Sequence, residues 1–98
     1  MFMYVAVAID PGSTIRAGEL AELLLQYGFK KVQRGLWESV AVSEKVLNRL
    51  KVDLDRATDM SDKLRLFQFP VENALSITSL ADKKWRRIVA RSSEKKQD

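Results

Sequence analysis

The chain has 98 residues, of which 46% are hydrophobic and 31% charged, and its formal net charge is +4. This length predicts one domain, and these fractions are typical of a folded globular protein. Because no apolar run approaches the roughly 20 residues of a membrane helix and no secretory leader is recognisable, we expect a cytoplasmic protein with no membrane role.

The missing residue types exclude several kinds of chemistry. The chain contains no Cys and no His. Disulfides, thiolate metal sites and cysteine nucleophiles are therefore excluded, and so are Ser-His-Asp triads and imidazole zinc ligands. A metal site made only of oxygen ligands remains open, and such a site suits Mg²⁺, Mn²⁺ or Ca²⁺.

The N-terminal segment predicts a buried strand that ends at a carboxylate. Residues 3–9 are apolar without interruption, which is typical of a strand covered on both faces. Asp10 follows as the first charged residue, and residues 11–13 read Pro-Gly-Ser, a turn sequence. A rigid strand end that faces solvent is a favourable place for a metal-binding carboxylate.

Two amphipathic helices are expected. Ser13 or Thr14 is placed to cap the first, which runs to about Tyr27 and is stopped by Gly28. Ser43 is placed to cap the second, over residues 44–57. Each carries an apolar stripe at helical spacing: Leu20, Leu23, Leu24 and Tyr27 in the first, and Leu47, Leu50 and Leu54 in the second.

Extended segments are expected between and after the helices. Residues 29–42 are extended, and Gly35 in their middle indicates a bend that divides them into two short strands. Residues 63–69 alternate as a strand that Pro70 ends, and residues 74–80 form a further short strand. We interpret Trp37 as a packing residue.

The end of the chain is basic. Residues 1–81 carry ten basic and ten acidic side chains, whereas residues 82–98 carry seven basic and three acidic ones. We therefore divide the chain into a domain over 1–81 and a basic tail over 82–98, in which Trp85, Ile88 and Val89 form one apolar helical turn and the part beyond Ala90 is disordered. Such a tail is either a frayed, solvated end or a contact for a phosphate-rich partner.

The element order predicts an α+β fold. It is that of a ferredoxin-like βαββαβ sandwich, an antiparallel sheet with two helices on one face. This fold hosts many functions and by itself assigns none. A twofold homodimer is the commonest oligomer for such a short chain and would add buried surface.

Four basic residues are candidate nucleic-acid contacts. Arg16 opens the first helix, whose N-terminus favours anions. Lys30, Lys31 and Arg34 flank the second strand, where they would contact a phosphate backbone without reading its sequence. The alternative for each is an ordinary solvated charge. The acidic residues between 53 and 62 lack the spacing of a Ca²⁺ loop and are interpreted as helix-end and loop residues that favour solubility.

Several motifs together resemble one known family. A first strand ends in Asp10, a helix ends in Leu-Leu-x-x-Tyr-Gly-Phe, and two later motifs follow, Lys-Val-Gln-Arg-Gly-Leu-Trp-Glu at 31–38 and Asp-Lys-Leu-Arg-Leu-Phe at 62–67. In these features the chain resembles the CRISPR-associated protein 2 family over residues 3–80.

The resemblance implies a ferredoxin-like homodimer of the spacer-acquisition machinery. It implies an extra C-terminal strand, residues 74–80, that pairs across the homodimer, and a bridging contact with the CRISPR integrase, CRISPR-associated protein 1. It further implies a metal-dependent endonuclease on DNA or RNA, with Asp10 as catalytic residue and metal ligand. A dimer could place both Asp10 copies around one Mg²⁺ or Mn²⁺ at its axis.

Alternatives remain both for the role of Asp10 and for the function of the whole chain. The Asp10 carboxylate could instead accept hydrogen bonds from the N–H groups of its own turn. The chain as a whole could be a non-catalytic ferredoxin-like nucleic-acid-binding or regulatory module, or a toxin-type ribonuclease of related fold. The leading hypothesis is a CRISPR adaptation protein that binds duplex DNA.

Overall fold

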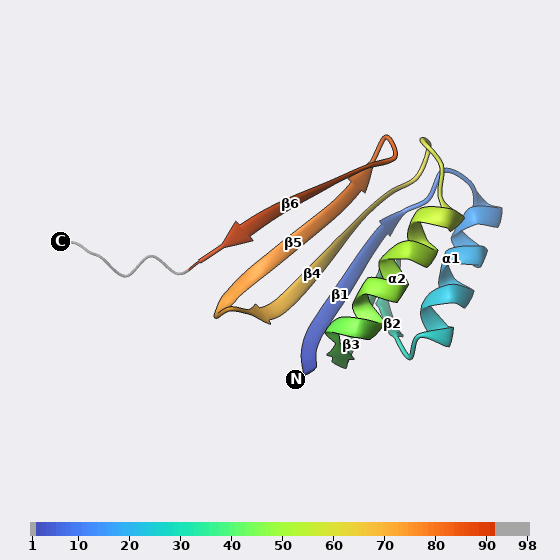
Figure 1. Cartoon of the computed structure of the whole chain (residues 1–98). Helices are drawn as coiled ribbons and strands as arrows, with labels where there is room; N and C mark the ends of the chain where they lie inside the picture. Colours follow the sequence, from blue (N-terminus) through green and yellow to red (C-terminus); the bar gives the residue numbers. More distant parts are fainter. Residues whose placement is uncertain (1, 92–98) are drawn as a thin grey trace.

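Two helices cover one face of a six-stranded antiparallel sheet in the computed structural model, which describes residues 2–91 (Figure 1). The elements in chain order are β1 (Phe2–Asp10), α1 (Thr14–Gln26), β2 (Lys30–Gln33), β3 (Leu36–Ser43), α2 (Glu44–Ala57), β4 (Lys63–Val71), β5 (Ala74–Ala81) and β6 (Lys84–Ala90). None of the helices in this described part is long and apolar enough to span a membrane.

The strand order is β2-β3-β1-β4-β5-β6. The first six elements and the order β2-β3-β1-β4 are consistent with a ferredoxin-like core, and the α+β prediction is confirmed. Strands β5 and β6 extend the sheet beyond β4, outside the area that the two helices cover (Figure 1). β5 pairs with β4 on one side and with β6 on the other, so both of its edges are occupied within the chain.

The hydrophobic core lies between the helices and the sheet. The predicted helix stripes are confirmed, since Leu20 and Leu24 of α1 and all three leucines of α2 are buried. They pack against β1, β3 and β4, whose buried residues include Val5, Val7, Trp37, Leu64 and Leu66. Trp37 is therefore a packing residue, as expected.

Gly35 makes the predicted bend between β2 and β3. Its φ is +72°, in the left-handed region that favours glycine, and an added Cβ would lie 2.9 Å from the carbonyl oxygen of Ile9. The carbonyl oxygen of Gly35 accepts the N–H of Ile9 at 2.7 Å. The bend is thereby joined to the end of β1.

Strand β4 does not end at Pro70 as predicted but continues to Val71. The pairing of β4 with β5 shifts register between Gln68 and Val71, and such an irregularity accommodates a residue that has no N–H to donate. Glu72 and Asn73 then connect β4 to β5 with positive φ at both positions, as a type I′ hairpin requires.

The helical turn expected around Trp85 is wrong. A second two-residue turn with positive φ, at Asp82 and Lys83, returns the chain as strand β6 along β5. Strand alternation places Trp85 and Val89 on the helix side of the sheet and Ile88 on the other, because cross-strand pairing outweighs a helical pattern of three residues. Residues 84–90 of the expected tail thus belong to the sheet, and the rest of the tail beyond residue 91 lies outside the described residues.

Candidate functional site

The side of the sheet opposite the helices carries the end of β1 that holds Asp10. Val5 and Val7 are fully buried beneath the helices, so strand alternation turns Ala6, Ala8 and Asp10 to the other side. Neither helix covers that side (Figure 1), and we call it the open face.

Asp10 is exposed on the open face, and its carboxylate has no hydrogen-bond or ion-pair partner among residues 2–91. It pairs across the sheet with Lys63 of β4. The two residues line a depression of about 310 Å³, together with Ala8, Ile9, Leu64, Arg65, Ser79, Leu80 and Ala81. The carboxylate is thus held at the end of a central strand and left available for an outside ligand.

Asp62, not Asp10, holds the turn that follows β1. The Asp62 carboxylate is 1% exposed and accepts the N–H of Gly12 at 2.7 Å and the N–H of Asp59 at 2.9 Å. Interpreting Asp62 as a solubility residue was therefore wrong. Nothing local in the sequence indicated this role, because Gly12 and Asp62 are 50 positions apart.

Arg16 is engaged inside the fold. Its Nε lies 3.2 Å from the Asp62 carboxylate, its Nη2 lies 3.3 Å from that of Asp59, and its Nη1 donates to the carbonyl oxygen of Ala57. The pKa of Asp59 is lowered mainly by the hydrogen bond from the Ser61 hydroxyl, with a smaller contribution from the Arg16 charge. Because its donors meet protein acceptors, Arg16 is poorly placed for the phosphate contact expected from the sequence.

The other three predicted basic contacts do not form one patch. Lys30 pairs with Glu38 and Lys31 with Trp37, so the two lysines lie on opposite sides of edge strand β2. Arg34 lies in the turn before Gly35, which is bonded to Ile9. Of the three, only Arg34 is therefore near the Asp10 end of β1.

A group of basic residues on the open face lies beside Asp10. Arg65 of β4 pairs with Ala8 on one side and with Ser79 on the other, and Ser79 pairs in turn with Arg86 of β6. Adjacent strands are about 4.8 Å apart, so Arg65 and Arg86 are separated by roughly 10 Å. We call the four basic residues of this end of the open face the basic band: Lys63, Arg65, Lys84 and Arg86.

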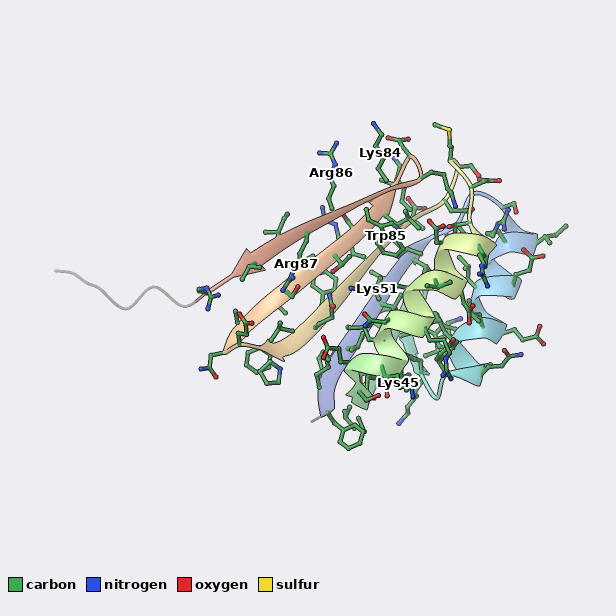
Figure 2. All side chains as sticks on the ribbon, viewed as in Figure 1. Lys45, Lys51, Lys84, Trp85, Arg86 and Arg87 are labelled. Atoms are coloured by element: carbon green, nitrogen blue, oxygen red, sulfur yellow. The ribbon has the colours of Figure 1, made fainter. Side chains whose placement is uncertain are left out.

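Figure 2 shows Lys84 and Arg86 extending from the same side of β6, away from the helices. Sequence reasoning did not select Lys63 and Arg65 as contacts. The signal was present, because residues 63–66 alternate basic and apolar side chains and so place both cations on one side of a strand.

The rest of the open face is largely apolar. Ala6, Phe67, Ile77 and Ile88 follow one another across four adjacent strands. Ile88 remains 56% exposed and Phe69 49% exposed. At its border the Tyr4 hydroxyl donates to the Glu38 carboxylate at 2.8 Å, and that hydrogen bond is the main reason why the pKa of Tyr4 is raised.

The structure provides a single carboxylate at this site. Among the described residues 2–91, no group of three or more Asp or Glu side chains is placed to hold a metal ion. A hydrated Mg²⁺ needs only one or two carboxylates when phosphate oxygens complete its shell. The available Asp10 carboxylate therefore fits such an ion only if a second copy of the chain or a bound phosphate contributes ligands.

Comparisons of this chain with protein-family models, with curated proteins and with solved structures found no match.

Proposed function

We propose that the protein binds the phosphate backbone of nucleic acid on its open face and hydrolyses a phosphodiester bond at Asp10. The observation that carries the proposal is an exposed carboxylate that has no partner among residues 2–91 and is fixed at a central strand end beside four cations. The cations would attract and position the backbone without reading its sequence. Duplex DNA is the preferred substrate in this proposal, and RNA is the second.

A homodimer formed through the open face is part of the proposal. The exposed side chains of Phe69 and Ile88 support it, because contiguous apolar surface on one side of a sheet is typical of an interface. The cross-dimer strand pairing expected from the family resemblance would require β5 to leave its partners in this chain. Contact through the open face requires no such change.

The metal is proposed as Mg²⁺ or Mn²⁺ held by Asp10 and the partner's Asp10. When bound, such an ion supplies Lewis acidity toward water and the phosphate. The residues of this chain would bind and orient the substrate. Lys63 and Arg65 would hold the phosphate oxygens, and Asp10 would keep its position because β1 is paired on both sides.

The resemblance of residues 3–80 to the CRISPR-associated protein 2 family supports a role in spacer acquisition. In that role the homodimer would bind duplex DNA and bridge two copies of the CRISPR integrase. Genomic proximity to an integrase gene and a repeat array, and co-purification with that integrase, test this part separately from the chemistry.

A second candidate is a non-catalytic nucleic-acid-binding module. The presence of one carboxylate per chain at the site favours it, because cleavage would then depend entirely on ligands from outside the chain. In that case binding would require the basic band but not Asp10.

The decisive experiment compares Asp10→Asn with the wild type on labelled duplex DNA and RNA, in Mg²⁺, Mn²⁺ or EDTA. We expect wild-type cleavage that EDTA abolishes and a loss of at least about 100-fold in Asp10→Asn, with DNA binding retained. Asp82→Asn, which removes an exposed hairpin carboxylate, is the control and should cleave normally.

Each alternative gives a different result. Equal cleavage by Asp10→Asn and the wild type would refute the catalytic assignment. Binding without any wild-type cleavage would favour the non-catalytic module. Absence of binding to both nucleic acids would refute the proposed function altogether.

A further inference from the structure

A groove lies on the helix side of the sheet, between α2 and the outer strands. It arises because β5 and β6 continue the sheet beyond the area that the helices cover (Figure 1). Its volume is about 390 Å³, and we call it the α2–β6 groove. Its lining residues are Lys51, Val52, Asp55, Arg56, Thr78 and Trp85.

The one carboxylate that lines this groove is already engaged. Asp55 accepts a hydrogen bond from the Trp85 indole nitrogen at 3.2 Å and lies 3.4 Å from the ammonium group of Lys83. These contacts connect the hairpin before β6 to the last turns of α2. The Asp55 carboxylate is therefore already paired with a cation outside the groove lining.

Two cations lie close together at this groove: Lys51 lines it, and Arg87 adjoins it as the cross-strand neighbour of the lining residue Thr78. Lys51 comes from α2 and Arg87 from β6, and Figure 2 shows the two side chains directed toward the space between those elements. Within the described residues, neither forms an ion pair at 4.0 Å or less. The Nε of Arg87 donates to the Ser76 hydroxyl at 2.9 Å, which leaves the two terminal nitrogens of the guanidinium available.

The floor beneath Arg87 is polar, buried and hydrogen-bonded. Ser76 is 2% exposed, and Gln68 is buried as well. The side-chain nitrogen of Gln68 donates to the Thr78 hydroxyl at 2.9 Å and to the Ser76 carbonyl oxygen at 3.3 Å. The exposed Arg87 side chain is therefore positioned by a hydrogen bond to a buried polar network.

The pairing of these cations is unfavourable for the free protein. Burial, and then the positive charge of Arg87, lower the pKa of Lys51. Lysines whose charge is taken out of water are usually paired with an acid. A half-buried lysine that instead faces an arginine indicates a position where an anion would be stabilising.

We propose that the α2–β6 groove binds a phosphate group of a nucleic-acid backbone between Lys51 and Arg87. The site is on the other side of the sheet from Asp10 and therefore goes beyond the function proposed above. Its position suits an extended polyanion, because β6 is the edge strand and also places Lys84 and Arg86 on the open face. A backbone that passes around this edge would meet cations on both sides of one strand.

The test measures binding of labelled duplex DNA and single-stranded RNA by fluorescence anisotropy over a series of salt concentrations. We expect Lys51→Gln and Arg87→Gln each to weaken binding by about tenfold and to reduce the salt slope by about one. Lys45→Gln, on the same helix but outside the groove, should bind like the wild type. Lys51→Arg should retain most of the affinity because it keeps the charge.

A second readout separates a ligand site from a structural role. Replacing Lys51 by Met removes a cation that is poorly placed in the free protein, so we expect a melting temperature raised by about 2–4 °C together with weaker binding. In NMR titrations, inorganic phosphate or the short duplex should raise the pKa of the Lys51 ammonium group.

Two outcomes would overturn the inference. One is unchanged binding in both Lys51→Gln and Arg87→Gln while Arg65→Gln of the basic band weakens binding, which would leave the proposed function intact. The other is a groove that binds polyglutamate more tightly than DNA, which would assign it to an acidic protein segment.

Discussion

The turn that presents Asp10 depends on a few residues elsewhere in the chain. Gly12 donates its N–H to Asp62, and a Cβ added at Gly12 would lie 2.1 Å from the Ser61 hydroxyl oxygen. The same Asp62 carboxylate meets the guanidinium of Arg16. Because the Asp62 carboxylate accepts the hydrogen bond from the N–H of this turn, the Asp10 carboxylate is left available.

Replacing Asp62 by Ala should destabilise the fold strongly. The change leaves the Arg16 charge without its buried partner and the Gly12 N–H without an acceptor, which costs about 3–5 kcal/mol in the free energy of unfolding. Urea denaturation measures this loss. Asp59→Ala removes a carboxylate that is 61% exposed and should have a much smaller effect, and equal effects of the two changes would contradict this account.

Residue-scale prediction succeeded where the information was local. Asp10 could be placed at an exposed strand end because it directly follows an uninterrupted apolar run. The partners of Arg16 could not be predicted, because Asp59 and Asp62 reach it only once the loop before β4 has folded against α1. An isolated arginine at a helix start is typical of a phosphate contact and of a structural ion pair alike.

At the level of elements, the two helices are joined by a polar contact beside their leucine stripes. The Tyr27 hydroxyl, just after α1, donates to the Asp53 carboxylate of α2. Burial, and then the Asp53 hydrogen bond and charge, raise the pKa of Tyr27 to about 12, while Arg49 acts in the opposite direction. The contact therefore depends on a protonated tyrosine.

The Tyr27 contact predicts a loss of stability in alkali. In the unfolded chain the tyrosine hydroxyl has a pKa near 10, about two units below the pKa of Tyr27 in the folded protein. A pKa raised in the folded state gives stability that is complete below about pH 10 and lost as the pH rises to about 12. Unfolding free energies of wild type and Tyr27→Phe should converge across this range, and parallel curves would contradict the assignment.

The elements themselves were predictable to different degrees. Both helices followed from apolar stripes repeated over several turns, and the β2–β3 bend followed from Gly35. Strand β6 did not, because Trp85, Ile88 and Val89 are compatible with one helical turn, and the choice depended on the Asp82–Lys83 hairpin and on pairing with β5. Neither residue of that turn is the glycine that usually marks a two-residue hairpin.

At the scale of the whole molecule, the sheet has one covered and one open side. The open face combines an apolar row with the basic band, so association and backbone binding would use neighbouring parts of one surface. The family resemblance predicted a homodimer that pairs through residues 74–80, but both edges of β5 are occupied within the chain. The apolar row of the open face could not be predicted from the sequence, because only the strand order places Phe67, Ile77 and Ile88 side by side.

Introducing a charge into the apolar row should disrupt the proposed dimer. We expect wild type to sediment as a dimer and Ile88→Glu to weaken association by at least about tenfold, because a carboxylate would be buried without a partner. Ile15→Glu changes an isoleucine of α1 that is also exposed and should leave the dimer intact. A monomeric wild type at micromolar concentrations would contradict the interface.

The central position of β1 also constrains how the protein is made. Its neighbours in the sheet are β3 and β4, and its pairing with β4 joins Tyr4 to Phe69. Strand β1 is synthesised before both of its partners, and its second edge is closed only after β4 has been made; such long-range pairing slows folding. Until then its apolar residues remain open to incorrect partners, so β1 is the segment on which aggregation during synthesis would begin.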